Sequence, residues 1–385
     1  YRDEITAIDD KLLELFHKRM RIAEKIAQYK KENNIPILNT SVERAKLAEL
    51  SEKADDDMLF YSRILFNTLF EMSRSYQEKL NHPKSVLMQK IESAIENTNR
   101  LFPSTGNIAC QGVEGAYSQL ACDKLFDSPN IMYFTTFEGV FSAIDKNLCK
   151  YGVLPLENST AGSVNKVYDL MMRYKFNIIR SVRLKIDHNL LAKKGVKKNE
   201  IKEIYSHEQA ISQCSEFIKQ LGNVKINVCE NTAIAAMKVA NSERFDIAAI
   251  SSRPCAELYG LNCVSESVQD KGNNYTKFIC ISKDIEIYPG ADKTSIMMVL
   301  PHKPGSLYRV LARFYILGIN LVKLESRPIP DRDFEFMFYF DIETPVYSEQ
   351  FTQLINELDE MSEDFRYLGS YLEIIWKNMD CLAEN

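Results

Sequence analysis

The sequence predicts a multidomain protein in which an all-α domain is followed by a two-lobed α/β domain and then an α+β domain. Its 385 residues exceed the roughly 100–200 residues of one typical domain. Apolar residues recur at helical spacing up to about Leu80, whereas short apolar runs alternate with amphipathic stretches between Asn107 and Asp284. From Lys293 onward, the predicted elements follow the order βαββαβ.

The first segment is expected to form three helices. No Gly or Pro occurs before Pro36, so the first helix should run from about Arg2 to Glu32. A second helix should follow Thr40 or Ser41, and a third should begin near Asp57. The apolar seam of the first helix has alternating spacings of three and four residues and should pack on other helices; it consists of Ile5, Ile8, Leu12, Leu15, Ile22, Ile26 and Tyr29.

The next residues, 83–105, are predicted to be a linker around a possible short helix, because prolines occur at both ends (Pro83 and Pro103). Beyond the linker, strands alternate with helical patterns at Tyr117–Phe126 and Gln209–Gln220, which favours an α/β fold in two lobes. The candidate strands are Ile108–Cys110, Tyr151–Pro155, Ile178–Ile186, Glu203–Tyr205, Ile226–Cys229, Ile247–Ile250 and Lys277–Ser282.

The last segment is expected to adopt the ferredoxin-like split βαββαβ arrangement. Its helices are predicted at Gly305–Leu317 and Ser348–Met361. Its strands are predicted at Thr294–Leu300, Asn320–Arg327, Phe334–Glu343 and Tyr367–Ile375.

Composition limits the partners of this chain. With 48 Lys and Arg against 53 Asp and Glu, the net charge is −5, which disfavours binding of nucleic acid or an anionic membrane by the surface as a whole. No apolar run approaches a membrane span, and the charged amphipathic start does not resemble a signal peptide. The nine cysteines are odd in number and scattered, without metal-ligand spacing. We therefore expect a reduced cytoplasmic protein without a structural metal.

Two cations stand out in the first segment. Arg19 occupies a seam position between Leu12 and Ile26, and Lys30 lies about 20° around the same helix, so both face one interhelical space. They could hold a small dianion, although a seam cation more often reaches solvent or pairs with a glutamate. Arg2 lies roughly 100° off that face and would reach the same pocket only from another chain.

The order of residues in this segment resembles the AroQ-type chorismate mutase domain, a three-helix fold that forms interlaced dimers. The resemblance implies transition-state electrostatics, with arginines on the two carboxylates and with Lys30 and Gln77 donating to the ether oxygen. Two positions depart from the family pattern: Asn39 replaces an aspartate, and Val42 replaces an arginine next to Glu43. The family's chorismate-binding positions fall on Arg2, Arg19, Lys30, Glu43, Ser73 and Gln77.

Four blocks mark the central segment: Gly112–Ser118 (GVEGAYS), Pro155–Ser159 (PLENS), Ser206–Ala210 (SHEQA) and Asn274–Phe278 (NYTKF). Each block alone is more often a turn or a helix cap than a site. Together and in this order they resemble the prephenate dehydratase family, with a two-lobed, periplasmic-binding-like α/β fold and no cofactor.

The dehydratase resemblance makes Thr276 the catalytic residue, donating a hydrogen bond or proton to the departing ring hydroxyl. Asn158, Ser206 and Gln213 would fix the substrate's polar groups. Lys277 replaces the family's arginine, which keeps the charge but loses the bidentate fork for a carboxylate. His207 is equally well explained as a general acid or as a structural histidine.

The last segment resembles the ACT domains attached to prephenate dehydratases. Two loops carry this resemblance, Pro304–Leu307 and Leu324–Pro328. It implies feedback inhibition by L-phenylalanine bound across a dimer interface. The implied binding residues are Gly305, Ser306, Leu307, Asn320, Glu325 and Ser326.

These resemblances predict a bifunctional chorismate mutase–prephenate dehydratase, assembled as a homodimer or homotetramer. The expected boundaries are 1–82 for the mutase domain, 106–284 for the dehydratase domain and 292–376 for the ACT domain. Two alternatives stay open: a monofunctional dehydratase whose mutase domain serves dimerisation, which Val42 favours, and a non-catalytic amino-acid sensor, which the intact Thr276 block disfavours.

Overall fold

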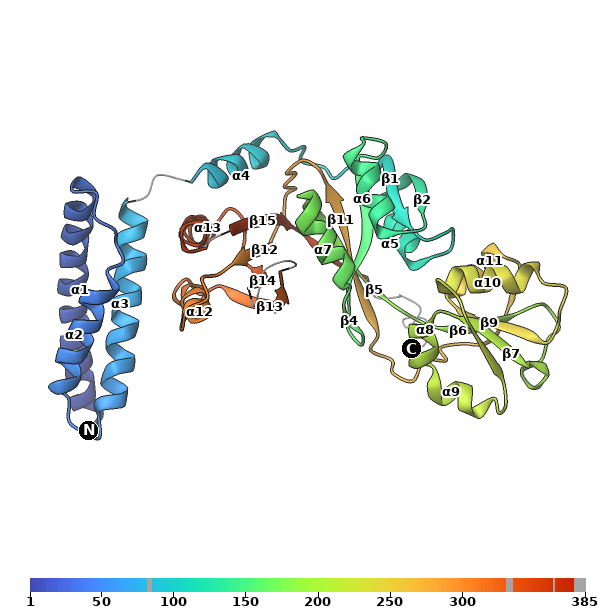
Figure 1. The fold of residues 1–385 in the computed structure, drawn as a ribbon, viewed down its shortest axis with the longest axis horizontal. Helices are drawn as coiled ribbons and strands as arrows, with labels where there is room; N and C mark the ends of the chain where they lie inside the picture. The colour runs from blue at the N-terminus through green and yellow to red at the C-terminus, as the bar shows by residue number, and fades with distance from the viewer. Residues whose placement is uncertain (82–84, 330–334, 363, 377–385) are drawn as a thin grey trace. The chain divides into compact units, whose positions relative to one another are not determined.

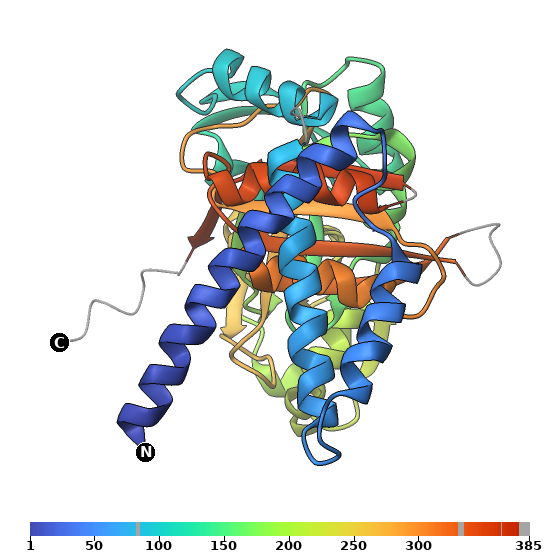
Figure 2. The same ribbon diagram turned by 90° about the vertical axis from the view of Figure 1, so that its left-hand side faces the viewer.

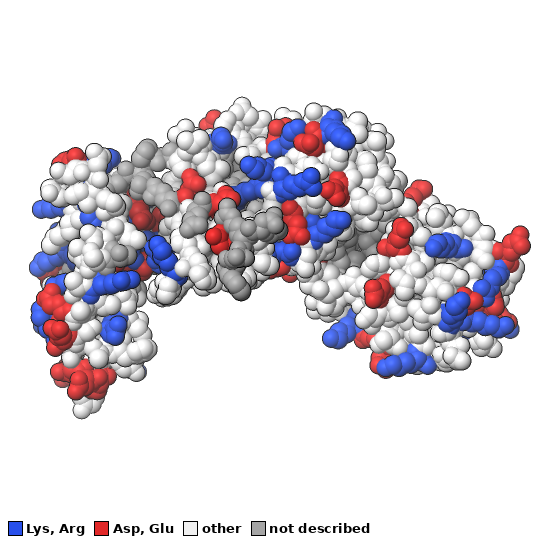
Figure 3. All heavy atoms as spheres, in the orientation of Figure 1, with Lys and Arg blue, Asp and Glu red and all other residues white. Residues whose placement is uncertain are grey.

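A computed structural model describes residues 1–81, 85–329, 335–362 and 364–376. The chain forms two compact units, each assembled from separate stretches of sequence. One combines residues 1–93 with 293–367, and the other combines residues 94–292 with the segment from residue 368 onward. No helix in the described ranges is long and apolar enough to cross a bilayer. On the face drawn in Figure 3, acidic and basic side chains alternate over each part of the surface.

The chain begins with three helices, α1 (Arg2–Glu32), α2 (Thr40–Glu52) and α3 (Leu59–Asn81), close to the predicted positions. Asn39 caps α2, because its side chain accepts a hydrogen bond from the Val42 N–H at 3.2 Å. The N-terminal half of α1 diverges from α2 and α3 (Figure 2). As a result, the predicted apolar seam is not buried by this chain alone: Ile5, Ile8, Leu12 and Leu15 are each more than half exposed.

Much of the segment expected to be a linker is helix α4 (Val86–Asn97). Met88 and Ile91 on this helix are almost completely buried, so it is a packed element and not a free connection. The predicted break at His82 and Pro83 lies outside the described residues.

Two sheets build the α/β unit, as the two-lobed prediction requires (Figure 1). The first has the order β16-β5-β11-β3-β1-β2, with β4 (Gly162–Ser163) paired to β3. Gly152 on β3 leaves space for α6, because an added Cβ would lie 2.6 Å from Ile144 and 2.9 Å from Val140. The strands are β1 (Thr105–Gln111), β2 (Ser128–Phe134), β3 (Tyr151–Asn158), β5 (Asn177–Lys185), β11 (Tyr275–Ser282) and β16 (Glu373–Trp376), and the helices are α5 (Tyr117–Leu125), α6 (Phe137–Asp145) and α7 (Asn165–Tyr174).

The second sheet has the order β10-β6-β9-β7-β8 and belongs to the other lobe. Apolar clusters cover both of its faces, because the small residues of β9 (Ile247–Ser251) contribute to each. The other elements of this lobe are β6 (Asn189–Ala192), a 3₁₀ turn (Lys198–Glu200), β7 (Glu203–Ser206), α8 (Glu208–Gln213), α9 (Ser215–Gln220), β8 (Lys225–Val228), α10 (Thr232–Asn241), α11 (Arg253–Leu258) and β10 (Asn262–Ser265).

The remaining elements follow the predicted order βαββαβ, and the sheet order β13-β14-β12-β15 is that of the ferredoxin-like split motif. Both helices cover the same face of this sheet (Figures 1 and 2). The elements are β12 (Lys293–Val299), α12 (Ser306–Ile316), β13 (Asn320–Pro328), β14 (Phe336–Glu343), α13 (Glu349–Met361) and β15 (Asp364–Tyr371). Residues 330–334 of the predicted domain lie outside the described ranges.

The prediction of one final strand at Tyr367–Ile375 was wrong. The chain leaves β15 after Tyr371 and continues as β16, which pairs in parallel with β5 of the α/β unit. Gly369 permits this path, because a Cβ there would lie 2.1 Å from the carbonyl oxygen of Ile178. The hydrophobic alternation runs through the break, so the pattern does not reveal it.

Candidate active sites

The α/β unit contains a cavity of about 560 Å³ between its two lobes, lined by the ends of β3 and β11 and by the N-terminal ends of α5, α7, α8 and α10. Such helix ends favour anions through their positive dipole ends and N–H groups. Among the described lining residues, Glu230 is the one Asp, Glu, Lys or Arg. The polar lining residues are Gln111, Ser118, Asn158, Ser163, His188, His207, Gln209, Gln213, Asn231, Thr232 and Thr276.

Asn158, at the end of β3, is oriented by the backbone. Its Oδ1 accepts hydrogen bonds from the N–H groups of Thr160 at 3.0 Å and Ala161 at 2.9 Å. The Asn158 amide nitrogen must therefore point the other way, where it donates to Thr276 Oγ1 at 2.9 Å and to Asn274 Oδ1 at 2.8 Å. The register of β3 and β11 places Asn158 directly opposite Thr276.

These contacts continue into a closed ring of neutral side chains. Asn274 donates to Gln213 Oε1 at 2.9 Å, and Gln213 donates to Thr160 Oγ1 at 2.8 Å. Thr160 completes the ring by donating to Asn158 Oδ1 at 2.7 Å. The N–H groups of Thr160 and Ala161 identify the Asn158 oxygen and therefore its amide nitrogen. Each later donor in the ring follows from this assignment, so the direction of each hydrogen bond is fixed.

The ring determines what Thr276 can do. Its oxygen accepts a hydrogen bond from Asn158, and its own O–H remains available to donate. Thr276 is largely buried, and it lines the cavity together with Phe278. The structure thus brings three predicted residues, Thr276, Asn158 and Gln213, into one network.

The two histidines of the cavity wall have defined tautomers. His188 Nε2 lies 2.9 Å from Gln213 Oε1, an acceptor, so Nε2 carries the hydrogen. His207 Nδ1 accepts from the Gln209 N–H at 3.3 Å, which leaves its hydrogen on Nε2. Burial lowers the pKa of both imidazoles, outweighing nearby carboxylates, so both are neutral near pH 7.

Ser206 does not lie among the residues that line the cavity. Its side chain is fully buried, and its hydroxyl donates to the Ile250 carbonyl oxygen at 2.7 Å. In this structure Ser206 therefore fastens β7 to β9 instead of facing a ligand.

The expectation that Lys277 helps to bind a substrate carboxylate is contradicted. Consecutive strand residues point to opposite faces, so Lys277 points away from the cavity that Thr276 lines. Its Nζ lies 3.1 Å from the Tyr371 hydroxyl and 3.9 Å from the Glu373 carboxylate. Arg183 also contacts Glu373, at 2.6 Å. Lys277 thus belongs to a buried charged cluster that holds β16 on the sheet.

A second group of predicted residues meets between α1, α2 and α3. Arg19 donates to the Leu69 carbonyl oxygen at 3.1 Å and to Ser73 Oγ, and Lys30 donates to the Ile37 carbonyl oxygen at 2.5 Å. The Glu43 carboxylate is bound by Arg74 of α3. Burial lowers the pKa of both Arg19 and Lys30, while the Glu43 charge opposes this shift.

Two other predicted residues complete this description. Gln77 is buried on α3, and its Oε1 has no hydrogen-bond partner among the described residues. Arg2 is exposed at the start of α1, about 26 Å along the helix axis from Arg19, so this chain does not bring the two together. We name the group formed by Arg19, Lys30, Glu43, Ser73 and Gln77 the helical pocket.

The predicted phenylalanine-binding residues lie on two elements. Gly305 precedes α12 in a left-handed conformation, followed by the buried Ser306 and by Leu307. The Ser306 hydroxyl has no hydrogen-bond partner within the described ranges. On β13, the three predicted residues are Asn320, which donates to Glu343 at 2.8 Å, Glu325, which contacts Lys323 at 3.1 Å, and Ser326.

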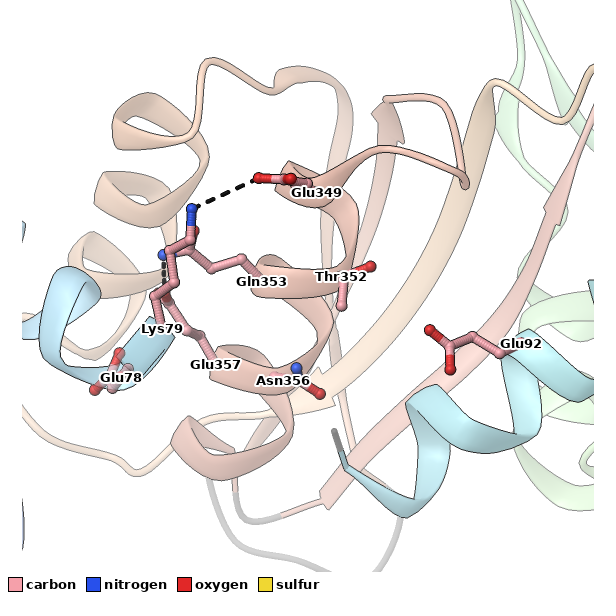
Figure 4. Close-up of a pocket in the computed structure, with 8 residues that line it drawn as sticks. All are labelled: Glu78, Lys79, Glu92, Glu349, Thr352, Gln353, Asn356 and Glu357. Atoms are coloured by element: carbon pink, nitrogen blue, oxygen red, sulfur yellow. Dashed lines mark hydrogen bonds and ion pairs between the residues drawn. The ribbon is translucent and has the colours of Figure 1, made fainter. Parts of the chain in front are cut away.

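Figure 4 shows a further cavity, of about 400 Å³, formed by α3, α4 and α13. Four glutamates line it, Glu78, Glu92, Glu349 and Glu357, with Lys79 contacting Glu349 at 3.6 Å. Beside it, the buried Arg313 of α12 contacts Glu357 at 3.0 Å and Glu78 at 3.4 Å. This cavity contains no residue predicted to bind substrate, and three of its glutamates, Glu78, Glu349 and Glu357, serve the contact between α3 and the βαββαβ elements.

Comparison with known proteins identifies two families along the chain. Residues 1–78 match the family Chorismate mutase type II, and residues 108–286 match the family Prephenate dehydratase. The bifunctional chorismate mutase/prephenate dehydratase of Enterobacter agglomerans is 33% identical over 378 residues, covering 96% of this chain and 94% of that protein. The chain belongs to this bifunctional family.

Other relatives match a smaller share of this chain. The chloroplastic arogenate dehydratase/prephenate dehydratase 2 of Arabidopsis thaliana is 34% identical, covering 78% of this chain and 80% of that protein. Among solved structures, Arthrobacter aurescens prephenate dehydratase in complex with L-Phe has a TM-score of 0.63 at 27% identity, covering 69% of this chain and 89% of that chain. GqqA, described as a novel type of quorum quenching acylase, has a TM-score of 0.64 at 28% identity, covering 69% of this chain and 98% of that chain.

Proposed function

We propose that this chain converts chorismate to prephenate and prephenate to phenylpyruvate in L-phenylalanine biosynthesis, under feedback inhibition by L-phenylalanine. The observation that carries the dehydratase assignment is the Asn158–Thr276 hydrogen bond, which makes the Thr276 hydroxyl a donor inside the cavity. The resemblance of residues 1–78 to chorismate mutases carries the mutase assignment.

In the dehydration, Thr276 donates to the ring hydroxyl as the C–O bond breaks. The bond between the ring and its carboxylate breaks at the same time, and its electron pair completes the aromatic ring as CO₂ leaves. The departing hydroxyl takes the Thr276 proton and leaves as water, and a proton from solvent restores the Thr276 hydroxyl, so that prephenate and one proton give phenylpyruvate, CO₂ and water. The donor stabilises the negative charge that develops on this oxygen. The Asn158–Asn274–Gln213–Thr160 ring holds the donor in place, and helix N-termini favour the dianionic substrate.

In the mutase reaction, the helical pocket would hold chorismate in its compact pericyclic conformation. Arg19 and Lys30 supply positive charge for the carboxylates and for the ether oxygen, whose negative charge grows as the C–O bond breaks. Arg2 would come from a second copy of the chain, since it lies far from Arg19 within one chain.

The domains proposed for these tasks are 1–82, 106–284 and 292–376, the last an ACT domain that binds L-phenylalanine near Gly305, Ser306, Leu307, Asn320, Glu325 and Ser326. An assembly of at least two chains is supported by the exposed apolar side chains of Ile5, Ile8, Leu12 and Leu15, which a second α1 would cover. A cytoplasmic location also stays a prediction.

A direct assay tests these functions. The purified chain is given chorismate or prephenate, with and without L-phenylalanine, and both substrates and phenylpyruvate are measured. If phenylpyruvate forms from prephenate but chorismate is not consumed, the chain is a monofunctional dehydratase. No product from either substrate by folded protein would favour an amino-acid sensor. Arogenate belongs in the same assay, because the Arabidopsis relative is named for both substrates.

A further inference from the structure

The helical pocket contains one cation that the sequence pattern does not identify. Arg74 follows Ser73 on α3, and its side chain is only 8% exposed. One of its guanidinium nitrogens, Nη1, contacts both carboxylate oxygens of Glu43, while Nη2 contacts Glu71. A buried guanidinium with two carboxylate partners occupies a defined position.

Glu43 depends on Arg74 for its position. On α2, its neighbour Val42 is apolar and exposed, and Arg44 is also exposed. Within the described part of the chain, Arg74 is the residue that binds the Glu43 carboxylate by hydrogen bonds or ion pairs. The cation that holds this carboxylate is thus supplied by α3 and not by α2.

Glu43 also lies within electrostatic reach of the two cations that face the pocket. Its charge acts on Arg19 and on Lys30, and Arg74 acts on Lys30 with the opposite sign. Without Arg74, the most favourable partners for the Glu43 carboxylate would be Arg19 and Lys30 themselves. A carboxylate bound there would compete with a dianionic ligand for both cations.

We propose that Arg74 is a positioning residue of the mutase site, holding the Glu43 carboxylate so that Arg19 and Lys30 stay available for the carboxylates of chorismate. This inference rests on the proposed mutase activity. Arg74 is itself held by Glu71, whose other carboxylate oxygen lies 3.7 Å from Arg313 of α12. Its position is therefore secured by a chain of alternating charges.

The test compares variants of the full-length chain in the chorismate assay. Arg74→Met should raise KM for chorismate at least tenfold, with a smaller change in kcat, because Glu43 then occupies the cations. Because Glu43 itself belongs to the helical pocket, the reference for the double variant is Glu43→Gln alone. Arg74→Met combined with Glu43→Gln should have a kcat/KM close to that of Glu43→Gln and above that of Arg74→Met, since the competing charge is gone. Arg74→Lys keeps the charge but loses the fork, so its KM should lie between those of the parent protein and Arg74→Met.

Matched controls separate this role from a merely structural one. Lys79→Met makes the matched cation-to-Met change on the same helix, at an exposed position that contacts Glu349, and should leave KM for chorismate within twofold. Dehydratase activity and circular dichroism identify variants that do not fold. An unchanged KM in Arg74→Met would overturn the proposal, and so would a folded double variant as impaired as Arg74→Met.

Failure of the proposed mutase activity gives a different result. In that case the parent protein consumes no chorismate although it dehydrates prephenate. Calorimetry with chorismate then makes the same comparison: weaker binding by Arg74→Met, restored by Glu43→Gln, supports the proposal, and equal binding by all variants overturns it.

Discussion

The cavity of the α/β unit and the helical pocket both suit small dianions, but one is lined by neutral polar groups and the other by charged side chains. The cavity presents neutral amides, hydroxyls and helix N-termini, and its hydrogen bonds close into a ring within one chain. The helical pocket presents Arg19 and Lys30 beside a held carboxylate, and the apolar face leading to it is exposed. In the cavity, a ring of directed hydrogen bonds holds one donor, the Thr276 hydroxyl. In the helical pocket, ligand binding by Arg19 and Lys30 depends on every neighbouring charge and on a second chain.

The largest expected effect separates the two sites completely. Thr276→Val removes the donor and should lower kcat for prephenate dehydration by about 10²–10⁴-fold, the usual contribution of a positioned proton donor. Thr276→Ser keeps the hydroxyl and should retain much of the activity. Consumption of chorismate, measured in the same preparation, should be unchanged. A Val variant with normal dehydration would refute the assignment of Thr276.

The next effect tests the dependence of the helical pocket on a second chain. Leu12→Glu places a charge in the exposed apolar face of α1 and should reduce mutase activity at least tenfold by preventing assembly, a loss typical of an interface centre. Dehydration of prephenate should change less than twofold. Size-exclusion chromatography with light scattering measures the assembly, and Lys11→Gln on the same exposed helix, which also lowers the net charge by one, is the control.

The third prediction removes the hydrogen-bond donor of Asn158. Asn158→Asp cannot donate to Thr276 or to Asn274, and the loss of a buried donor costs about 1–3 kcal/mol. Steady-state kinetics should show kcat for dehydration falling about tenfold or more at pH 7, with mutase kinetics unaffected. Equal kinetics in the variant and the parent protein would show that donation by Asn158 is unimportant for dehydration.

The smallest effect concerns ionic strength. Raising NaCl from about 0.05 to 0.5 M shortens the Debye length from roughly 14 to 4 Å. The KM for chorismate should increase several-fold, because Arg19 and Lys30 are only partly buried and their charges are screened by salt. The KM for prephenate should change less, since neutral groups and helix ends in a partly enclosed cavity are screened weakly. The opposite order of sensitivities would contradict the comparison.

The sequence predicts the ends of strands better than the directions of side chains. Asn158, Gln213 and Thr276 were identified through the resemblance to the dehydratase family, but the ring also needs Thr160 and Asn274, and His188 contacts it through Gln213. Thr160 directly follows the Pro155–Ser159 block and Asn274 is the first residue of the Asn274–Phe278 block, a signal that could have been used, whereas nothing in the spacing marks His188. Strand alternation should also have shown that Thr276 and Lys277 point to opposite faces.

Other differences have physical reasons beyond local pattern. Strand β2 was missed because its exposed sequence contains Pro129 and only weak alternation. Arg74 was missed because a cation beside Ser73 gains its meaning only from Glu43, 31 residues away on another helix. Long-range pairing of charges leaves no periodic trace in one sequence.

The path of the last strand has a practical consequence for dissecting this protein. Because β16 lies beside β5, the sheet that carries Thr276 is completed by residues encoded after the βαββαβ elements. A gene fragment covering only residues 94–292 would encode a sheet with an unpaired edge at β5. It would also leave Lys277 and Arg183 without Glu373. Fragments intended to isolate the dehydratase should therefore end no earlier than residue 376, and the C-terminal elements are best removed by an internal deletion rather than by truncation.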